Sequence, residues 1–339
     1  MILLLIGSIS GADLPPIIDL YYIKFNYTSG TTNDAIDIRI NNSTDISVPE
    51  WYPSYSRNEK IAYKKSQSNR KIKAKFYVYN GPINNMKVYA NHSGGWGNIN
   101  EGTVTFNGSA YSSEALLTFS GTTPSSVGKR YLALIWYITE IDGEPIADTY
   151  IHDSGFHAYY TLLDDPVSPM QEPWTQVLDY TCSWASGQTT NSGTIKKITE
   201  GAYNNIGKTY YGGDSHTYAQ NFYLTNFFSE NYADCQDMSA VVQTFSNAVG
   251  ISNVKVRRVL GPFYTQYILP IGTSNWLYSI EWGIHQFSYY NNKVYDAVLK
   301  LWDPIRIPTA EGIYNNYYYD LFLSGTWNLL TPTAYTNVY

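Results

Sequence analysis

The chain has 339 residues, which is more than one compact hydrophobic core usually holds, so its length predicts two domains with extensions. Apolar residues make up 44% of the chain, ample for a globular protein, whereas charged residues make up only 15%, well below the usual quarter. The 34 tyrosines and many Asn, Ser and Thr residues take their place, a balance typical of an extracellular surface. The formal net charge is −6 and no run of Lys and Arg is long enough to follow a phosphate backbone, so we expect no nucleic-acid partner.

Residues 1–12 combine an apolar run with a following group of small residues, which is similar to the second half of a secretory signal. They lack the basic start of such a signal, so a clipped start or an ordinary buried strand is the alternative. No later segment has the length of a membrane span. We expect 1–12 to be a truncated signal segment, no transmembrane segment to follow, and the protein to be extracellular or at the cell surface.

Short β-prone runs separated by turn residues fill residues 13–165. Residues 72–79 alternate polar and apolar side chains before a turn sequence at 80–82, and residues 131–138 precede a similar sequence at 142–143. Evenly spaced runs of this kind, without helical periodicity, are typical of an antiparallel sandwich. We therefore predict an immunoglobulin-like β-sandwich as an N-terminal accessory domain.

The pattern changes after a polar, proline-bearing joint at residues 164–169, which suits a domain boundary. Apolar residues then recur at helical spacing, and β-prone runs follow them. The expected helices are 173–185, 195–202 and 236–249, with Gly250 as a left-handed cap, and the expected strands are 254–260, 276–289 and 294–302. This order predicts an α+β domain of helices packed on an antiparallel sheet over residues 166–305, with residues 306–339 as an extension packed on that core.

Cys235 lies at the expected start of the third helix. There the helix dipole and the unpaired backbone N–H groups favour an anion, so we expect a stabilised thiolate with a lowered pKa. The same N–H groups can donate to an oxyanion when a carbonyl is attacked. Cys235 is therefore the candidate nucleophile.

A thiolate nucleophile needs a base, and that base needs a third group to hold it. His285 is the histidine on an expected strand with a carboxylate, Asp296, on the next strand. If Asn291 and Asn292 form a two-residue turn, a role that suits Asn because it tolerates positive φ, then His285 and Asp296 are diagonal neighbours on one face of the hairpin. A turn of odd length would put them on opposite faces.

The run from Asp234 to Asp237, its glycine-ended helix, and the later His285 and Asp296 strands together resemble the transglutaminase-like superfamily. The resemblance covers about residues 174–303 and implies a papain-like α+β core in which Cys235, His285 and Asp296 form a catalytic triad. It also implies that Cys235 attacks an amide carbonyl and forms a thioester. Family members pair the cysteine N–H with a side-chain donor to the oxyanion, often an upstream Trp or Gln. This makes Trp184 the candidate for the side-chain donor; the alternative is that Trp184 is an ordinary core residue.

Each of these assignments has a simpler alternative. A disulfide between Cys182 and Cys235 would exclude thiol catalysis, and His285 with Asp296 could be an ordinary buried pair. His216 lies in a glycine-containing loop and is expected to be solvated. His152, Asp153 and His157 lack a supporting ligand cluster, so we expect neither a metal nor another cofactor.

Two functions follow from the sequence. The first is a secreted thiol-dependent acyl-transfer enzyme acting on a protein or peptide substrate, with hydrolysis favoured over cross-linking because water needs no acceptor site. The alternative is a non-catalytic extracellular protein that keeps the fold and binds carbohydrate or protein, with cell-surface or glycan contact through the N-terminal domain. Aromatic richness suits the second function, because aromatic faces bury much area at small entropic cost.

Overall fold

The structure is a computed structural model that describes residues 16–25, 34–46, 48–53, 59–93, 96–155, 157–301, 312–313, 317 and 320–339. The expected signal segment, 1–12, lies outside the described residues. Two compact units divide the chain. The first comprises Met1–Asp37, Ile46–Ser125 and Arg130–Thr161, and the second comprises Ile38–Asp45, Ser126–Lys129 and Leu162–Tyr339. The expected boundary at 165 lies a few residues after this division, and nothing in the sequence pattern indicated that 38–45 and 126–129 belong with the second unit.

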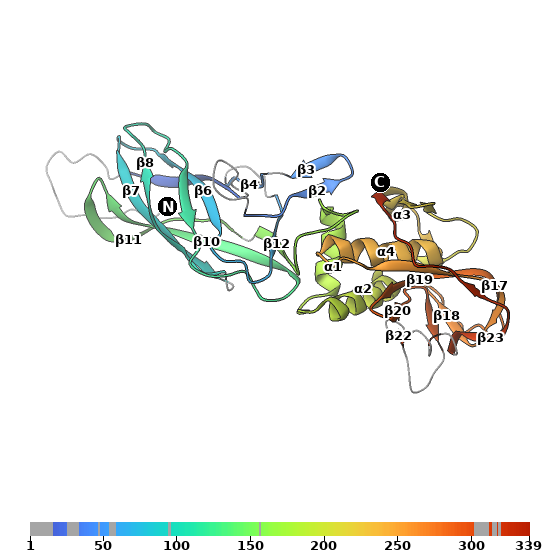
Figure 1. Cartoon of the computed structure of the whole chain (residues 1–339). Helices are drawn as coiled ribbons and strands as arrows, with labels where there is room; N and C mark the ends of the chain where they lie inside the picture. Colours follow the sequence, from blue (N-terminus) through green and yellow to red (C-terminus); the bar gives the residue numbers. More distant parts are fainter. Residues whose placement is uncertain are drawn as a thin grey trace. The chain divides into compact units, whose positions relative to one another are not determined.

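The first unit is built from two sheets (Figure 1). One has the order β4-β1-β6-β9, and the other has the order β5-β12-β10-β7-β8, with β11 paired to β10. The strands of the first sheet are β1 (Ile18–Lys24), β4 (Glu50–Trp51), β6 (Lys71–Val78) and β9 (Ala115–Thr118). Those of the second are β5 (Ile61–Lys64), β7 (Asn85–Ser93), β8 (Ile99–Thr105), β10 (Gly128–Ile141), β11 (Glu144–Asp153) and β12 (His157–Leu162).

The core of the first unit lies between these two sheets. In β6 every second residue is buried, which is the alternation expected of a strand with one face on a core. Buried side chains from both sheets form one cluster that includes Phe76 of β6 and Trp136 of β10, whose rings lie 5.4 Å apart. Asp142 and Gly143, both at positive φ, join β10 to β11, as their turn-forming sequence predicts.

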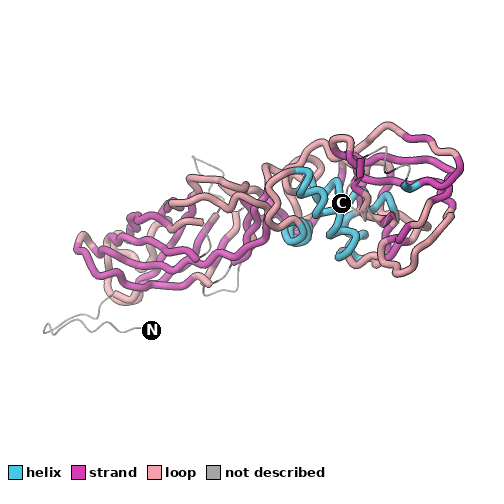
Figure 2. Tube along the Cα trace, turned by 90° about the horizontal axis from the view of Figure 1, so that it is seen from below, coloured by secondary structure: helices cyan, strands magenta, loops and turns pink. Residues whose placement is uncertain are grey.

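The second unit holds the helices, which Figure 2 draws together at one part of the trace. They are α1 (Thr175–Trp184), α2 (Asn191–Asn205), α3 (Leu224–Ser229) and α4 (Cys235–Ala248). α4 is nearly all buried, because it packs on α1 and α2 and against strand β19 of the main sheet. The sequence therefore predicted the three longer helices, and it missed the short α3.

The main sheet of the second unit has the order β22-β20-β19-β17-β23, with β24 also paired to β17. Its strands are β17 (Lys255–Thr265), β19 (Glu281–Tyr290), β20 (Lys293–Tyr295), β22 (Gly312–Ile313), β23 (Phe322–Gly325) and β24 (Asn328–Leu329). Shorter ladders join β2 (Ile38–Asn41) to β3 (Thr44–Ile46), β13 (Thr209–Tyr210) to β16 (Tyr232–Ala233), β15 (Asn221–Phe222) to β14 (Thr217–Tyr218) and β25 (Asn337–Val338), and β18 (Ile268–Pro270) to β21 (Leu299–Leu301). C-terminal strands thus complete the sheet that carries His285.

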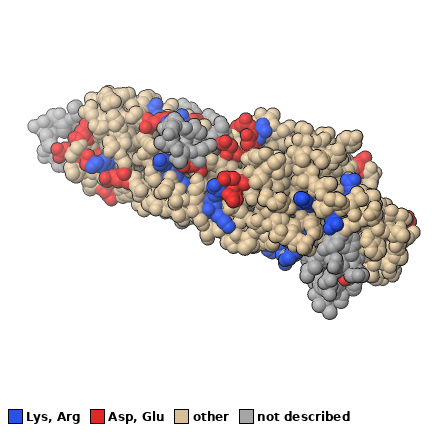
Figure 3. Space-filling model, in the orientation of Figure 1, with Lys and Arg blue, Asp and Glu red and all other residues tan. Residues whose placement is uncertain are grey.

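The described chain is mostly strand with few helices. Charged side chains are sparse on the face drawn in Figure 3, as the composition requires. No helix among the described residues has the length and apolar character needed to cross a membrane.

Candidate active site

The turn between β19 and β20 has the two-residue length that the sequence predicted. Tyr290 pairs with Lys293 and Ser288 with Tyr295, so only Asn291 and Asn292 lie between the strands. Their φ values are 48° and 60°, the left-handed region that Asn tolerates. The even turn length keeps positions 285 and 296 on one face of the hairpin.

His285 and Asp296 are in direct contact. His285 Nε2–H donates to Asp296 Oδ2 at 2.7 Å, and both side chains are almost completely buried. Asp296 follows the last residue of β20, and its Oδ1 accepts from the backbone N–H groups of Val298, at 2.8 Å, and Leu299, at 3.3 Å. One carboxylate oxygen therefore fixes the turn after β20, and the other fixes the imidazole ring.

Tyr317, which the sequence analysis missed, also reaches this pair. Its hydroxyl donates to Asp296 Oδ2 and lies 3.4 Å from His285 Nε2. Tyr317 is buried and comes from the C-terminal segment, 21 residues after Asp296. Among 34 tyrosines nothing in the local sequence distinguishes this one.

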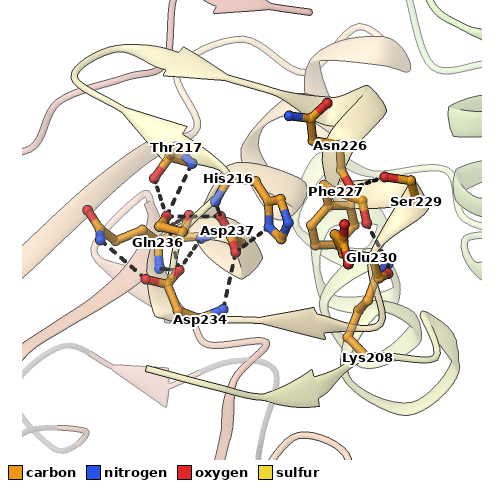
Figure 4. Close-up of polar contacts among 12 residues, drawn as sticks. Lys208, His216, Thr217, Asn226, Phe227, Ser229, Glu230, Asp234, Gln236 and Asp237 are labelled. Atoms are coloured by element: carbon orange, nitrogen blue, oxygen red, sulfur yellow. Dashed lines mark hydrogen bonds and ion pairs between the residues drawn. The ribbon is translucent and has the colours of Figure 1, made fainter. Parts of the chain in front are cut away.

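Cys235 is the first residue of α4, and Asp234 caps the helix (Figure 4). Asp234 Oδ1 accepts from the N–H groups of Gln236 and Asp237, each at 2.8 Å, and Asp237 Oδ2 accepts from Asp234 N–H at 3.2 Å. This reciprocal arrangement is a capping box in which Asp237 is the N3 residue, where Glu or Gln is more usual. Met238 N–H already bonds Asp234 O. Cys235 N–H is left with no acceptor among the described residues, so it can donate to an oxyanion.

The sulfur of Cys235 lies beside the strand that carries His285. The backbone N–H of Gln286, the residue after His285, lies close enough to the sulfur to lower the pKa of the thiol. His285 Nε2 is occupied by Asp296, whereas His285 Nδ1 is buried with no hydrogen-bond partner among the described residues. Of the two imidazole nitrogens, Nδ1 is therefore the one left unoccupied among these residues.

The expectation of a lowered Cys235 pKa is wrong. Cys235 is only 3% exposed, and burial raises the pKa of its thiol, as does the neighbouring Asp234 carboxylate. The Gln286 N–H and the Arg258 charge act in the opposite direction, but burial is the largest effect. Cys235 is therefore a neutral thiol at neutral pH.

A network of side chains holds β19 against the start of α4. Gln286 Nε2 donates to Ser239 Oγ of α4 at 2.6 Å and to Tyr335 Oη at 2.9 Å. Arg258 bridges the two elements, because its Nε donates to Gln286 Oε1 at 3.1 Å and one terminal nitrogen donates to Gln236 Oε1 at 2.5 Å. These bonds fix the Gln286 backbone that contacts Cys235.

Trp184 does not lie at the start of α4. Its ring stacks on Phe245, with centroids 6.0 Å apart, and it covers Gly201, where an added Cβ would stand 2.2 Å from the ring. Phe245 is ten residues after Cys235 in α4, about 15 Å along the helix axis. Trp184 is thus a packing residue, which was the alternative to its role as oxyanion donor. No contact with Cys235 among the described residues places it at the oxyanion.

The disulfide alternative is also wrong. Cys182 and Cys235 are both buried and no disulfide joins them. Cys182 lies on the buried face of α1 with Leu178. The sulfur of Cys235 is therefore present as a thiol, the form that can become a nucleophilic thiolate.

His216, expected to be solvated, is buried against the start of α4 (Figure 4). Its Nδ1–H donates to Asp237 Oδ2 at 2.9 Å, and its backbone N–H donates to Asp237 Oδ1 at 2.7 Å. Rings of Phe227 and Tyr232 enclose the imidazole. The sequence missed the pair of His216 and Asp237 because the two residues are 21 positions apart and belong to different elements.

Tyr210 and Trp282 complete the aromatic wall beside the site, and the sequence analysis singled out neither. The ring of Trp282 lies 5.5 Å from that of His285 and 5.5 Å from that of Tyr210. Trp282 Nε1 is buried and has no hydrogen-bond partner among the described residues. The sequence held no signal for this contact, because a spacing of three on a regular strand would place Trp282 and His285 on opposite faces.

The described residues contain no group of three or more His, Cys, Asp or Glu side chains arranged to hold a metal ion. His152 lies in β11 and contacts Asp19 at 2.8 Å, while His157 is buried and stacks on Trp51 with ring centroids 3.7 Å apart. His152 and His157 thus have other partners.

No protein-family model and no curated protein matches the chain. Among solved structures, the chain is similar to red sea bream transglutaminase, with 10% sequence identity and a TM-score of 0.27. The match covers 74% of this chain and 49% of that structure, so the chain spans about half the length of the transglutaminase. A likeness at this level carries no argument about this chain, so the chemistry must be argued from the geometry of the site.

Proposed function

We propose that the second unit is a transglutaminase-like thiol enzyme that attacks the amide carbonyl of a protein or peptide through Cys235, with His285 as base and Asp296 as its orienting carboxylate. The observation that carries this proposal is the buried contact of His285 Nε2 with Asp296, which leaves Nδ1 without a partner on the strand whose next N–H contacts the Cys235 sulfur. A nucleophile, a base and an orienting group in this order are the parts that acyl transfer needs.

The reaction begins with a neutral thiol. Cys235 Sγ bonds to the carbonyl carbon while its proton moves to His285 Nδ1 and the carbonyl π pair moves onto oxygen. The Cys235 N–H donates to that oxyanion. The C–N bond then breaks, and the amine nitrogen keeps the bonding pair and takes the proton from His285, which leaves a thioester on Cys235.

Water resolves the thioester in the second half of the reaction. His285 takes a proton from water as the hydroxide oxygen bonds to the thioester carbon, and the C–S bond then breaks with the pair on sulfur, which regains the proton. Hydrolysis is the simpler outcome, because an amine acceptor would need a binding site of its own. The proposal therefore is a cysteine hydrolase of amides, secreted or held at the cell surface.

The test uses p-nitrophenyl acetate, an activated ester whose acyl group any such thiol can accept. Peptide mass spectrometry should find acetyl on Cys235 and none on Cys182, with a burst of p-nitrophenol that is lost in Cys235→Ala and His285→Ala. Cys182→Ser is the matched control, and it should keep the burst. An acetyl group found only on lysines, or a burst that survives His285→Ala, would exclude the thiol mechanism.

A second candidate function rests on the first unit, which we propose to be an immunoglobulin-like module that binds carbohydrate. Tyr21, Tyr77, Tyr79 and Tyr111 form a continuous ring cluster on the sheet of β1 and β6, with neighbouring centroids 4.6 to 5.0 Å apart. Tyr79 and Tyr111 are 59% and 43% exposed. Lys75 lies 5.5 Å from the Tyr111 ring and adds a charge that could contact a glycan carboxylate.

This binding function is separable from the thiol. Glycan binding should fall at least about fivefold in Tyr111→Ala, since an exposed aromatic anchor contributes more than about 1 kcal/mol to binding. Tyr131→Ala, which removes an exposed tyrosine from β10, is the control. Cys235→Ala should leave binding unchanged. Equal binding by the Tyr111 and Tyr131 variants would argue against this surface.

A further inference from the structure

An acyl-transfer site usually offers an oxyanion more than one donor, and the start of α4 supplies only the Cys235 N–H. Asp234 already occupies the N–H groups of Gln236 and Asp237. Trp184 packs with Phe245, far along the same helix. A second donor must therefore come from another element beside Cys235.

Strand β13 passes directly beside the residues that lead into α4. It pairs in parallel with β16, so Tyr210 lies in register with Ala233, two residues before Cys235. Neighbouring residues of a strand point to opposite faces. Tyr211 accordingly contacts Tyr232 and is 53% exposed, whereas Tyr210 lies on the other face with its ring against Trp282.

The Tyr210 side chain is thus on the same side as the reacting residues. Its ring contacts Trp282, which in turn contacts His285. The hydroxyl lies over Gly212, where an added Cβ would stand 3.1 Å from it. This hydroxyl has no hydrogen-bond partner among the described residues, in contrast to Tyr203, whose hydroxyl donates to Leu269 O at 3.0 Å.

Burial and the neighbouring groups keep this hydroxyl protonated. Burial raises the pKa of Tyr210, and so do the neighbouring Cys235, Asp234 and Asp296, in that order. A tyrosine that cannot ionise at neutral pH remains a hydrogen-bond donor.

We propose that the Tyr210 hydroxyl is the side-chain donor that, together with the Cys235 N–H, stabilises the oxyanion formed when Cys235 attacks a carbonyl. This inference rests on the proposed acyl-transfer function. It assigns to a tyrosine on β13 the role that the sequence analysis gave to Trp184. The hydroxyl donates to the oxyanion without losing its proton, so the balance of the reaction described above is unchanged.

The test compares two reactions of the same sulfur. Acylation by p-nitrophenyl acetate passes through an oxyanion, whereas alkylation by iodoacetamide displaces iodide and forms none. Tyr210→Phe should therefore slow acetylation of Cys235 by about 100-fold, the usual effect of losing one oxyanion donor, while the alkylation rate changes less than about twofold. Tyr211→Phe is the matched control and should change neither rate.

The ratio of the two rates also separates an oxyanion effect from a loss of structure. A variant that is partly unfolded changes both reactions, because both need the same folded site. If the wild-type protein is never acetylated on Cys235, the proposed function fails. If it is acetylated and Tyr210→Phe keeps the wild-type ratio, the role of Tyr210 is excluded. If Tyr210→Phe keeps the wild-type ratio and the ratio falls in Trp282→Phe, which keeps an aromatic ring beside Tyr210 but removes the indole N–H, the donor is the Trp282 indole.

Discussion

His285 and Asp296 are 11 residues apart in sequence and 2.7 Å apart between Nε2 and Oδ2, because the Asn291–Asn292 turn joins β19 to β20 with an even number of residues. The contact therefore depends on the length of the turn as well as on the two residues themselves. A pair built across a hairpin in this way can be separated without changing either of its side chains.

Insertion of one glycine between Asn291 and Asn292 should abolish acetylation of Cys235. The added residue shifts the register of β20 and moves Asp296 to the other face, so the rate should fall by about 100-fold or more, the range of a lost acid–base group. Asn292→Gly is the control, because glycine adopts the positive φ of 60° at that position without strain. Acetylation kinetics with p-nitrophenyl acetate measure both variants, and an active insertion variant would contradict the role of the hairpin.

Asp296→Asn should lower the same rate by about 100-fold or more while the fold survives. The amide retains an acceptor for the Val298 N–H but no longer provides the charge that holds and stabilises the imidazolium of His285. Tyr317→Phe removes one hydrogen bond to the same carboxylate and leaves the contact with His285, so a loss of about tenfold is expected. Equal rates in the two variants would mean that Asp296 does not orient the base.

The parts of the site that depend on local sequence could be predicted. The turn follows from two adjacent asparagines, and the position of Cys235 follows from a cap, an apolar helical stripe and Gly250. These features involve residues within one or two turns of each other, so pattern and spacing determine them.

The remaining parts depend on contacts between distant segments, which no local pattern encodes. Tyr210, His216 and Tyr317 reach the site from separate elements. The raised pKa of Cys235 comes mainly from its burial, and burial outweighs the effect of the helix N-terminus that the sequence predicted. The division of the chain was likewise hidden, because the β2–β3 arm leaves the first unit and bonds Pro173 beside α1.

Asp234→Asn should make Cys235 more reactive at a given pH. Burial and the neighbouring Asp237 raise the pKa of Asp234 to about 6, so its charge appears as pH rises through 6 and then raises the pKa of the Cys235 thiol. The asparagine keeps a cap acceptor without the charge, and the pH profile of iodoacetamide alkylation should move down by about one unit. Glu230→Gln, an exposed residue, is the control and should leave the profile unchanged.

The raised pKa of Asp234 also determines how its contribution to the stability of the fold changes with pH. Asp234 binds its proton more tightly in the folded protein, so its contribution to stability is complete below about pH 4 and is lost as pH rises through about 6. Chemical denaturation should show that the free energy of unfolding falls less between pH 4 and pH 7 in Asp234→Asn than in the wild-type protein. An identical fall in the two proteins would mean that groups other than Asp234 cause it.

His216→Ala should destabilise the protein by about 3 kcal/mol, the usual cost of leaving a buried carboxylate without one of its hydrogen-bond donors. Asp237 is completely buried, and without the imidazole it keeps only its bonds to Ser215 and to backbone N–H groups. His152→Ala removes a similar contact to Asp19, but at partly exposed side chains, so a loss below about 1 kcal/mol is expected. Urea unfolding of both variants tests whether burial makes this difference.

Gly250→Ala should cost more than the same change at Gly207, although both glycines follow the C-terminal cap of a helix at positive φ. Alanine in this conformation costs about 1 kcal/mol at either position. At Gly207 nothing lies within 4 Å of an added Cβ, whereas at Gly250 the Cβ would stand 2.5 Å from the carbonyl oxygen of Asp164. Asp164 N–H donates to Val249 O at the end of α4. The clash therefore disturbs the contact that holds this end of α4 against residue 164. We expect a total loss of about 3 kcal/mol for Gly250→Ala in urea unfolding, since overpacking adds roughly 1 to 3 kcal/mol. Equal losses at the two glycines would mean that the Asp164 backbone moves aside without cost.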